Sequence, residues 1–235
     1  MVSYSFAPAS FHRGSLAKQK SDVTAAMLAK AGIANAGRIL DIGCGAGQTL
    51  RLVEELNNQA MLLGIDPDEE ACRSGRQGNQ RIHFVQGEGE HLPIADRSVH
   101  FAICRVAINY MHQATALREM ARVLAPGGRI VISFHAFGYA LRELLCPPKH
   151  GIRQRLGYLK DFVAGLVLHL VGYQGNRRTF WGRSVPYTAC SRLRRQLREV
   201  DFEVTWLRCE GHFLGWGTVQ WAIISRKQPC RPAKP

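Results

Sequence analysis

The segment RILDIGCGAGQT, residues 38–49, constrains this 235-residue chain more than any other. A short apolar run with one acid, Asp41, leads into glycines at alternate positions: Gly43, Gly45 and Gly47. Apolar residues then recur at helical spacing over residues 50–56. The pattern predicts a buried strand, a glycine turn and a helix. Such a turn offers free backbone N–H groups to a nucleotide-like ligand and lets it approach without a Cβ in the way.

The spacing of the glycines separates one class of nucleotide ligand from another. Dinucleotide folds use G-x-G-x-x-G, but residue 48 is glutamine and the third glycine comes one residue early, so we expect no NAD binding. The pattern D-x-G-x-G-x-G resembles the class I S-adenosylmethionine-dependent methyltransferases. The resemblance implies that S-adenosylmethionine is the cofactor, and that it binds through the acid and the turn: Asp41, Gly43, Cys44, Gly45 and Gly47.

A second buried strand is expected over residues 60–65, and it ends on Asp66 and Pro67. Asp66 lies 19 residues after Gly47, where a carboxylate can accept hydrogen bonds from both hydroxyls of a ribose. The alternative is a helix cap, because more acids follow and a helix begins there. The βαβ spacing after the glycine turn favours the ribose role, with Pro67 beside it.

A third strand is expected over residues 81–85, followed by GEGEHLPIADRSV at residues 87–99. That segment resembles the methyltransferase branch that acts in ubiquinone and menaquinone biosynthesis. The resemblance implies that Glu88 lies near the adenine amino group and that the backbone N–H of Gly89 faces the adenine ring. Two residues depart from the family pattern. Glu88 is one methylene longer than the usual Asp, and His100 replaces an acid at the start of the next strand.

The rest of the pattern completes a Rossmann-like α/β fold. Strands are expected at 99–104, 129–134, 202–208 and 219–225, and helices at 21–31, 113–124 and 189–200. The segment LREMARVLAPGGRIVISF, residues 117–134, is similar to the same family branch. We expect a doubly wound, mostly parallel seven-stranded sheet with an antiparallel C-terminal strand pair. Residues 1–235 are expected to form a single methyltransferase domain.

Methyl transfer is an in-line displacement that requires the acceptor about 3–3.5 Å from the methyl group. In this topology the carboxyl ends of the fourth and fifth strands face the donor. The polar candidates there are Arg105, Asn109, Tyr110, His112 and His135. We expect His135 to be a general base and Tyr110 to position the acceptor, although His135 could instead be a hydrogen-bonded loop residue. Cys104, through its backbone carbonyl, is expected to contact the methionine end of the cofactor, and Arg105 is also expected to bind the cofactor.

Residues 136–185 form an insertion where many relatives have a short link. The insertion contains an apolar run at 162–173, between two basic clusters. We expect a helical lid over a dry pocket for a small acceptor that is aromatic or isoprenoid-like. The alternative is a helix that only covers the sheet.

Positive charge is concentrated in the back of the chain. Residues 1–135 carry a net charge of +2 and residues 136–235 one of +11, which suggests an acidic partner. The 12-residue apolar run at 162–173 is too short to span a bilayer, so we expect weak, salt-sensitive association with an anionic membrane surface. We expect no sequence-specific binding to nucleic acid. A nucleic-acid methyltransferase and an inactive binding scaffold are the alternative functions.

The cysteine pattern gives no sign of a disulfide framework or a metal site. The chain has seven cysteines, an odd number, and no C-x-x-C pair. The first residues lack a basic end followed by an apolar core, so we expect no secretory signal. These features predict a cytoplasmic protein, at most peripheral at the membrane.

Overall fold

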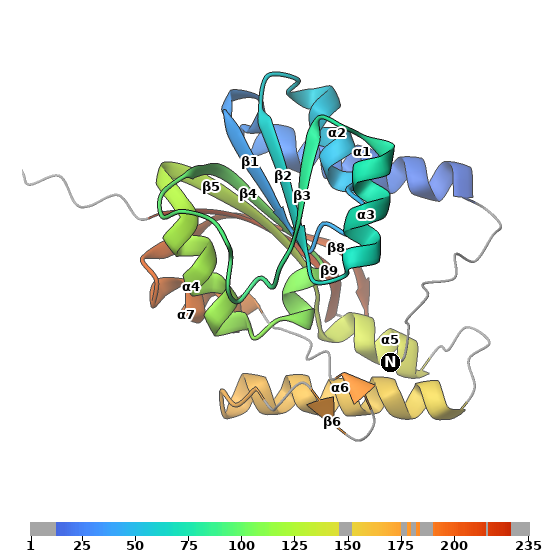
Figure 1. The fold of residues 1–235 in the computed structure, drawn as a ribbon. Coiled ribbons are helices and arrows are strands. Elements are labelled where there is room, and N and C mark those ends of the chain that lie inside the picture. The colour runs from blue at the N-terminus through green and yellow to red at the C-terminus, as the bar shows by residue number, and fades with distance from the viewer. Residues whose placement is uncertain are drawn as a thin grey trace, which may run out of the picture.

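The computed structural model describes residues 13–145, 152–174, 178–179, 182–183, 190–214 and 216–226. Its centre is a seven-stranded sheet with the strand order β3-β2-β1-β4-β5-β9-β8 (Figure 1). The strands are β1 (Arg38–Ile42), β2 (Met61–Asp66), β3 (Ile82–Gln86), β4 (Val99–Arg105), β5 (Leu124–His135), β8 (Phe202–Phe213) and β9 (Trp216–Arg226). Neighbouring strands are parallel from β3 to β5, and β9 pairs antiparallel with both β5 and β8. The fold class predicted from the sequence is confirmed.

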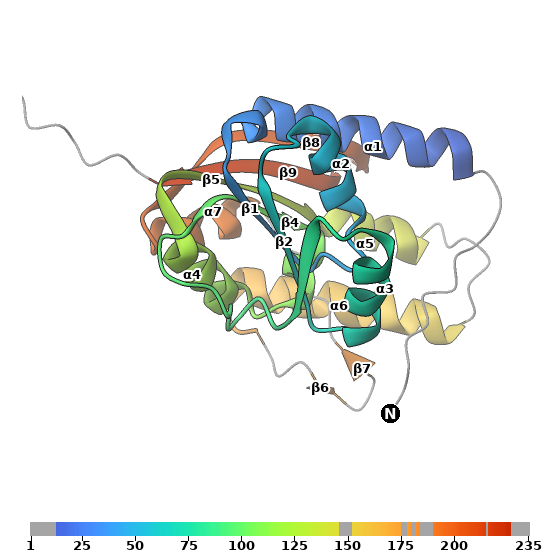
Figure 2. The ribbon, with the colours of Figure 1, turned by 45° about the horizontal axis from the view of Figure 1, so that its top comes forward.

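Helices cover both faces of the sheet (Figure 2). They are α1 (Arg13–Lys30), α2 (Gln48–Leu56) and α3 (Glu69–Gly78) on one face, and α4 (Gln113–Val123) and α7 (Cys190–Arg198) on the other. Central strand β1 is buried from Ile39 to Ile42, as expected for a parallel strand with a helical layer on each side. Its alternate side chains enter different cores, so Ile39 packs on the α1–α2 side and Leu40 on the α4–α7 side.

Several elements are longer than the sequence predicts. Helix α1 begins at Arg13, not at residue 21. Strand β8 continues past its predicted end at residue 208 to Phe213, and β9 begins at Trp216, before its predicted start at residue 219. Strand β5 begins at Leu124, five residues before the predicted start. The pairing of β4 with β5 shifts in register there, and the extra residues, with Gly127 at φ 77°, lie in this irregularity. The residues between the predicted helix at 113–124 and the predicted strand at 129–134 are therefore a bulged part of the strand.

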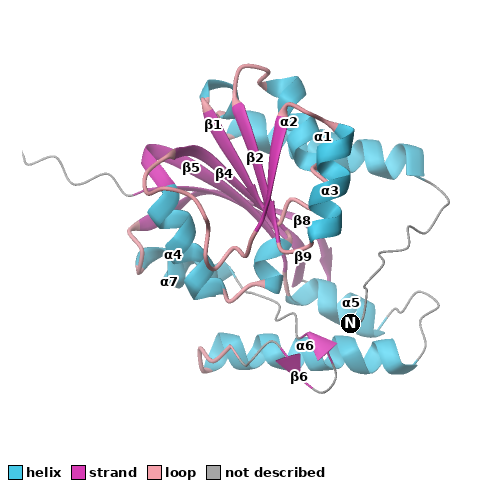
Figure 3. Cartoon of the chain, viewed as in Figure 1, coloured by secondary structure: helices cyan, strands magenta, loops and turns pink. Residues whose placement is uncertain are grey.

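The insertion is mainly helical where it is described, with α5 (Phe137–Leu145) and α6 (Ile152–Leu170) followed by the short strands β6 (Arg178–Thr179) and β7 (Gly182–Arg183). Helix α5 packs against β9 and α6, and α6 runs beneath α5 at the carboxyl edge of the sheet (Figure 3). The amide of Gln174 fastens the end of α6 to the loop after β4. It donates to the carbonyl of Met111 (2.7 Å) and accepts from the N–H of Gln113 (3.0 Å). That the insertion is a lid stays a prediction.

Arg122 of α4 holds the loop that leads from β3 to β4. Its guanidinium donates to the carbonyls of Leu92 (2.9 Å) and Ile94 (2.8 Å) and pairs with Glu119 and Asp96. Glu119 in turn accepts the N–H of Leu92 (2.9 Å). This loop contains the residues that the sequence places near the adenine, so α4 sets the position of one wall of the site.

Replacing Arg122 with Met should lower the free energy of unfolding by about 1–3 kcal/mol, because two loop carbonyls lose a charged donor. Arg118→Met, on the exposed side of the same helix, is the control and should change stability by no more than about 0.5 kcal/mol. Urea unfolding of both variants makes the comparison. Equal stability of the two would show that Arg122 does not hold the loop.

Candidate functional site

The glycine turn between β1 and α2 is tied to the end of β2. The N–H groups of Gly43 and Cys44 both donate to the carbonyl of Ile65, at 2.8 and 3.1 Å. Gly43, Gly45 and Gly47 all have left-handed backbones, with φ of 74°, 54° and 80°, a conformation that glycine adopts without strain. The turn therefore takes its shape from β2 as well as from its own residues.

The three glycines have different surroundings. A Cβ on Gly43 would clash with the Cβ of Ala107, and one on Gly47 would lie 2.5 Å from the ring of Phe84. At Gly45, no atom of the described residues lies within 4 Å of the added Cβ. Neighbouring side chains thus leave no room for a Cβ at Gly43 and Gly47, whereas Gly45 borders open space that a ligand can enter.

Asp66 lies beside this open space. Its Oδ2 accepts the N–H of Gly45 (2.7 Å) and its Oδ1 accepts the N–H of Asp68 (2.9 Å). The cap of α3 is Asp68, which accepts the N–H groups of Glu70 and Ala71. A carboxylate has about four lone-pair positions, so the Asp66 carboxylate still has room for a ligand's hydroxyl groups. The neighbouring Pro67 is exposed, and its carbonyl accepts the side-chain amide of Gln86 (3.1 Å).

Asp41, at the carboxyl end of β1, is 1% exposed. Neither of its carboxylate oxygens has a hydrogen-bond partner among the described residues. Burial raises the pKa of this carboxyl to about 7, Arg105 opposes the rise, and Asp66 adds to it. A buried acceptor without a partner is costly, so the site is suited to a ligand group that donates hydrogen bonds or carries positive charge.

The end of β4 connects the turn to the region of the acceptor. Arg105 donates from Nε to the hydroxyl of Thr49 (3.1 Å), at the start of α2. The next residue, Val106, has a left-handed backbone with φ of 64°, and its N–H donates to the carbonyl of Ser133 (2.8 Å). Burial raises the thiol pKa of Cys104 and Cys44 far above its usual range. These two thiols are therefore uncharged packing groups rather than nucleophiles.

The expected adenine wall follows β3. Glu88 is exposed and Gly89 is buried, and a Cβ on Gly89 would lie 2.5 Å from Sδ of Met111. Sequence reasoning missed Glu90, which is 5% exposed and accepts the N–H of His112 at 2.6 Å. The only feature of the sequence that pointed to Glu90 was the acidic segment GEGE, residues 87–90. Glu90 joins this wall to the loop after β4.

At the end of β5, Asn109 holds the backbone of His135. The Asn109 amide accepts the N–H of His135 (3.0 Å) and donates to its carbonyl (3.2 Å), and its side chain is fully buried. The His135 ring stacks on Tyr139 with centroids 4.0 Å apart. Tyr110, 42% exposed, comes from the 3-10 turn η2 (Ala107–Tyr110) before α4.

Burial, the largest cause, raises the pKa of Tyr139, and the nearby Glu143, Tyr158 and Tyr110 raise it further. His135 thus stacks on the Tyr139 ring, and Tyr110 and Tyr158 lie near enough to affect the Tyr139 pKa; we call these four residues the aromatic cluster. Sequence reasoning had no signal for Tyr139 or Tyr158, because both lie in the insertion. His112 is directed elsewhere, with its Nδ1 2.8 Å from the hydroxyl of Thr115.

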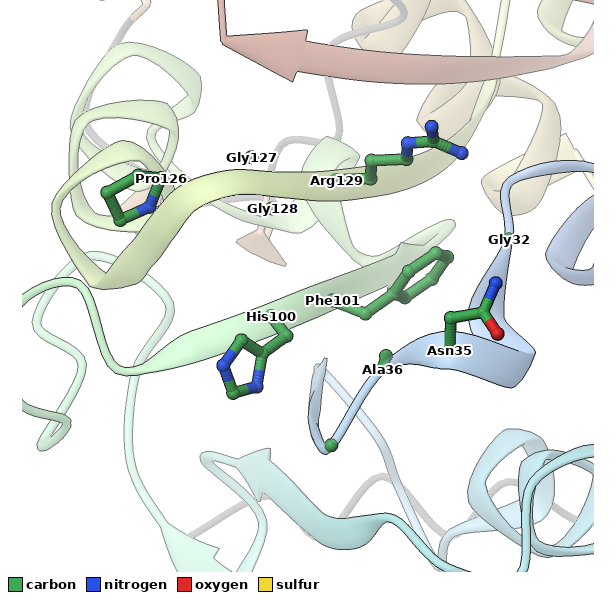
Figure 4. Close-up of a pocket in the computed structure, with 10 residues that line it drawn as sticks. Gly32, Asn35, Ala36, His100, Phe101, Pro126, Gly127, Gly128 and Arg129 are labelled. Atoms are coloured by element: carbon green, nitrogen blue, oxygen red, sulfur yellow. The ribbon is translucent and has the colours of Figure 1, made fainter.

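A separate hollow of about 350 Å³ lies at the opposite edge of the sheet (Figure 4). His100 and Arg129 line it near the amino ends of β4 and β5. Arg129 is also bonded there to the carbonyl of Ala31 (2.9 Å). Ligands of open parallel sheets bind at the carboxyl ends of the strands, so this hollow is separate from the cofactor cradle.

Comparison with known proteins shows similarity to methyltransferases over the first part of the sheet. A family model described as a methyltransferase domain matches residues 40–132. Residues 40–132 thus match a methyltransferase domain, in agreement with the class I S-adenosylmethionine-dependent pattern of the glycine turn. A malonyl-[acyl-carrier protein] O-methyltransferase of Methylococcus capsulatus is 34% identical over 61% of this chain and 54% of its own length. A ubiquinone/menaquinone biosynthesis C-methyltransferase of Ectopseudomonas mendocina is 32% identical over 43% of each chain. The chain thus spans about half the length of the curated relatives it matches.

Solved structures agree on the fold of this methyltransferase domain. An S-adenosylmethionine-dependent methyltransferase from Mesorhizobium loti matches with a TM-score of 0.63 at 19% identity, over 88% of this chain and 96% of its own. A geranyl diphosphate methyltransferase in complex with S-adenosylmethionine matches with a TM-score of 0.64 at 11% identity, over 90% of this chain and 87% of its own. A [4+2]-cyclase, SpnF, matches with a TM-score of 0.58 at 19% identity, over 85% of this chain and 63% of its own. The fold by itself therefore does not fix the reaction.

S-adenosylmethionine is the cofactor of this methyltransferase family, and the cradle has features that fit it. The unpartnered carboxylate of Asp41 suits the ammonium group of the methionine end. The open space at Gly45 suits a closely approaching ligand, and Asp66 has acceptor capacity left for the ribose. We expect these three residues to hold the cofactor, with Glu88 and Gly89 beside the adenine.

Asp41 should make the stability of the ligand-free protein depend on pH. Its pKa is raised from 3.8 to about 7, so the folded state binds the proton more tightly than the unfolded state. That stabilising contribution is complete below about pH 4 and is lost as the pH rises to about 7. Relative to Asp41→Asn, the wild type should lose about 2–3 kcal/mol of unfolding free energy between about pH 5 and pH 8. Asp68→Asn, at the exposed helix cap, is the control, and urea unfolding measures all three. A difference between wild type and Asp41→Asn that does not change with pH would contradict the assignment.

Asp66→Ala should weaken binding of S-adenosylhomocysteine by about 1–3 kcal/mol, because hydrogen bonds to a charged group are lost. Asp66 also holds the N–H of Gly45, so the variant alone does not separate the turn from the ribose. The 2′-deoxy analogue of the ligand separates them in a double-mutant cycle. We expect the wild type to bind the analogue more weakly, and the variant to bind both ligands equally in calorimetry. If the 2′-deoxy change weakens binding equally in both proteins, Asp66 does not bind the ribose.

Proposed function

We propose that the chain transfers the methyl group of S-adenosylmethionine to a small, largely apolar acceptor that is aromatic or isoprenoid-like. The observation that carries this proposal is the stack of His135 on Tyr139, with Tyr110 and Tyr158 near the same phenol. It adjoins the carboxyl edge of the sheet on the side of the helical insertion. The cofactor cradle lies at the same edge, so donor and acceptor would meet there.

The insertion supplies an apolar cover for that acceptor. Phe137 of α5 packs edge-on against Phe162 of α6, with ring centroids 5.8 Å apart, and also against His169 at 6.1 Å. Phe137 and Ala140 are buried between the two helices. A pocket of aromatic and apolar side chains with a few polar groups is typical of small-molecule sites. These contacts support an acceptor that is held by its rings or its hydrocarbon part.

The bound cofactor would supply a methyl group on a positively charged sulfur. The chain's own residues have the tasks of binding, orientation and exclusion of water. Asn109 fixes the backbone of His135, and the stack on Tyr139 fixes its ring, so the imidazole is held in one orientation at the edge of the sheet. Such positioning contributes to an in-line transfer, and the imidazole can accept a proton where the acceptor must lose one.

The named relatives support a small acceptor without identifying it. One is named for O-methylation of a malonyl-[acyl-carrier protein] and one for a C-methylation in ubiquinone and menaquinone biosynthesis. The second name refers to quinone chemistry, which agrees with an apolar cover over the site. Transfer to nucleic acid is less well supported, because the described insertion offers rings and apolar side chains to its ligand.

The test is formation of S-adenosylhomocysteine with a panel of phenols and prenylated hydroquinones. With an acceptor that must lose a proton, His135→Gln should lower kcat by about 10²-fold, the usual scale of general base catalysis. It should leave the Kd of S-adenosylhomocysteine unchanged. The wild-type rate should rise with pH through a histidine titration that the variant lacks.

His112→Gln is the matched control, since this histidine is bonded away from the cluster, and it should keep wild-type kcat. An unchanged rate and pH profile in His135→Gln would remove the base role. Absence of turnover with the whole panel, in protein that binds S-adenosylhomocysteine, would reject the acceptor class.

A further inference from the structure

The outer face of α6 is apolar where a surface helix is normally polar. All residues from 156 to 173 are described, and every one of them that is exposed is apolar. We define the α6 outer face by these residues: Leu156, Leu159, Val163, Leu166, Val167, Leu170, Val171 and Tyr173. Their exposed fractions run from 38% at Val167 to 75% at Val171.

Within residues 156–170 of α6, the charged and histidine side chains are turned toward the protein. The side chains of Lys160 and Asp161 are 25% and 15% exposed, and they lie 3.7 Å apart as an ion pair. His169 packs against the ring of Phe137. A helix on a water-facing surface has the opposite arrangement. A continuous exposed apolar strip of this kind marks a surface that binds a protein or a membrane.

Charge distinguishes the two kinds of partner. Residues 136–200, which include α6, carry 12 Lys and Arg against 3 Asp and Glu, a net charge of +9. A second copy of the chain on this face would bring two such segments together, and like charges repel. An anionic bilayer attracts them, and each cation near its surface favours binding. An apolar helix face bordered by cationic sequence is the composition of helices that lie in a membrane interface.

We propose that the α6 outer face docks on an anionic bilayer surface. Docking here means lying on the membrane, because no helix in the described part of the chain is long and apolar enough to cross a bilayer. The proposal goes beyond the methyl transfer proposed above and does not depend on it. Helix α6 lies at the carboxyl edge of the sheet, below α5 in the view of Figure 1. In a docked molecule, the edge of the sheet where the acceptor is proposed to bind would therefore lie next to the lipid.

The test is co-sedimentation of the full chain with phosphatidylcholine vesicles that contain phosphatidylserine. The double variant Val163→Gln/Leu170→Gln removes two apolar side chains, 49% and 71% exposed, without changing the charge. The control Met61→Gln/Leu214→Gln removes two that are 58% and 68% exposed in other parts of the fold. We expect the α6 variant to lower partition by about tenfold or more, because binding scales with buried apolar area. The control should bind like the wild type.

Salt and lipid charge provide the second comparison. Vesicles of phosphatidylcholine alone should bind much less protein. Raising the salt from about 0.1 M to about 1 M should also lower binding, because it shortens the Debye length from about 10 Å to about 3 Å. Unchanged calorimetric binding of S-adenosylhomocysteine and unchanged thermal unfolding will confirm that both double variants are folded.

Three results would overturn the proposal. Equal vesicle binding by the α6 variant and the control would place the contact elsewhere on the chain. Wild-type dimers in sedimentation velocity, lost in the α6 variant and accompanied by no vesicle binding, would make a second copy the partner. Sequence-selective binding to RNA or DNA in a gel shift, without vesicle binding, would assign the basic segment to nucleic acid.

Discussion

The bond between the carboxylate of Asp66 and the N–H of Gly45 is the contact on which the site depends. Together with the two bonds to the carbonyl of Ile65, it makes the end of β2 the template for the glycine turn. The template works only in one register, with Asp41 beside Gly64 and Ile42 beside Ile65. A shift of one residue would turn every side chain to the other face, so the cradle and the core form together.

The sequence predicts most of the fold because its signals are local. The glycine turn, the acids at the carboxyl ends of β1 and β2, and the alternating strand and helix patterns lie within short windows, and the observed strand order agrees with them. The acceptor side could not be predicted in the same way. The bonds from Asn109 to His135 span 26 residues, and the stack of His135 on Tyr139 depends on how α5 leaves the sheet. Neither contact has a pattern in the sequence.

The insertion shows a different limit of sequence reasoning. The apolar run at 162–173 predicts a helix, and α6 is observed there. Hydrophobic periodicity shows which residues share a face, and the usual assumption is that the apolar face meets the core. In α6 the core side includes the ion pair of Lys160 with Asp161, while Leu166 and Leu170 face outward. Only the packing of α6 against α5 shows that its outer face is apolar as well as its inner face, where Leu168 and Phe162 lie.

Two parts of the chain are energetically costly in isolation, and a different partner is proposed for each. Asp41 is a buried carboxylate without a hydrogen bond, and the α6 outer face is an apolar surface in water. Both cost free energy in the chain alone, and a ligand that binds only the folded state returns stability to it. Because the cofactor cradle and α6 lie at the same edge of the sheet, the acceptor region would be bounded by the cofactor on one side and the membrane on the other. An apolar acceptor could then reach the methyl group from the lipid without first entering water, where its hydrocarbon part is poorly solvated.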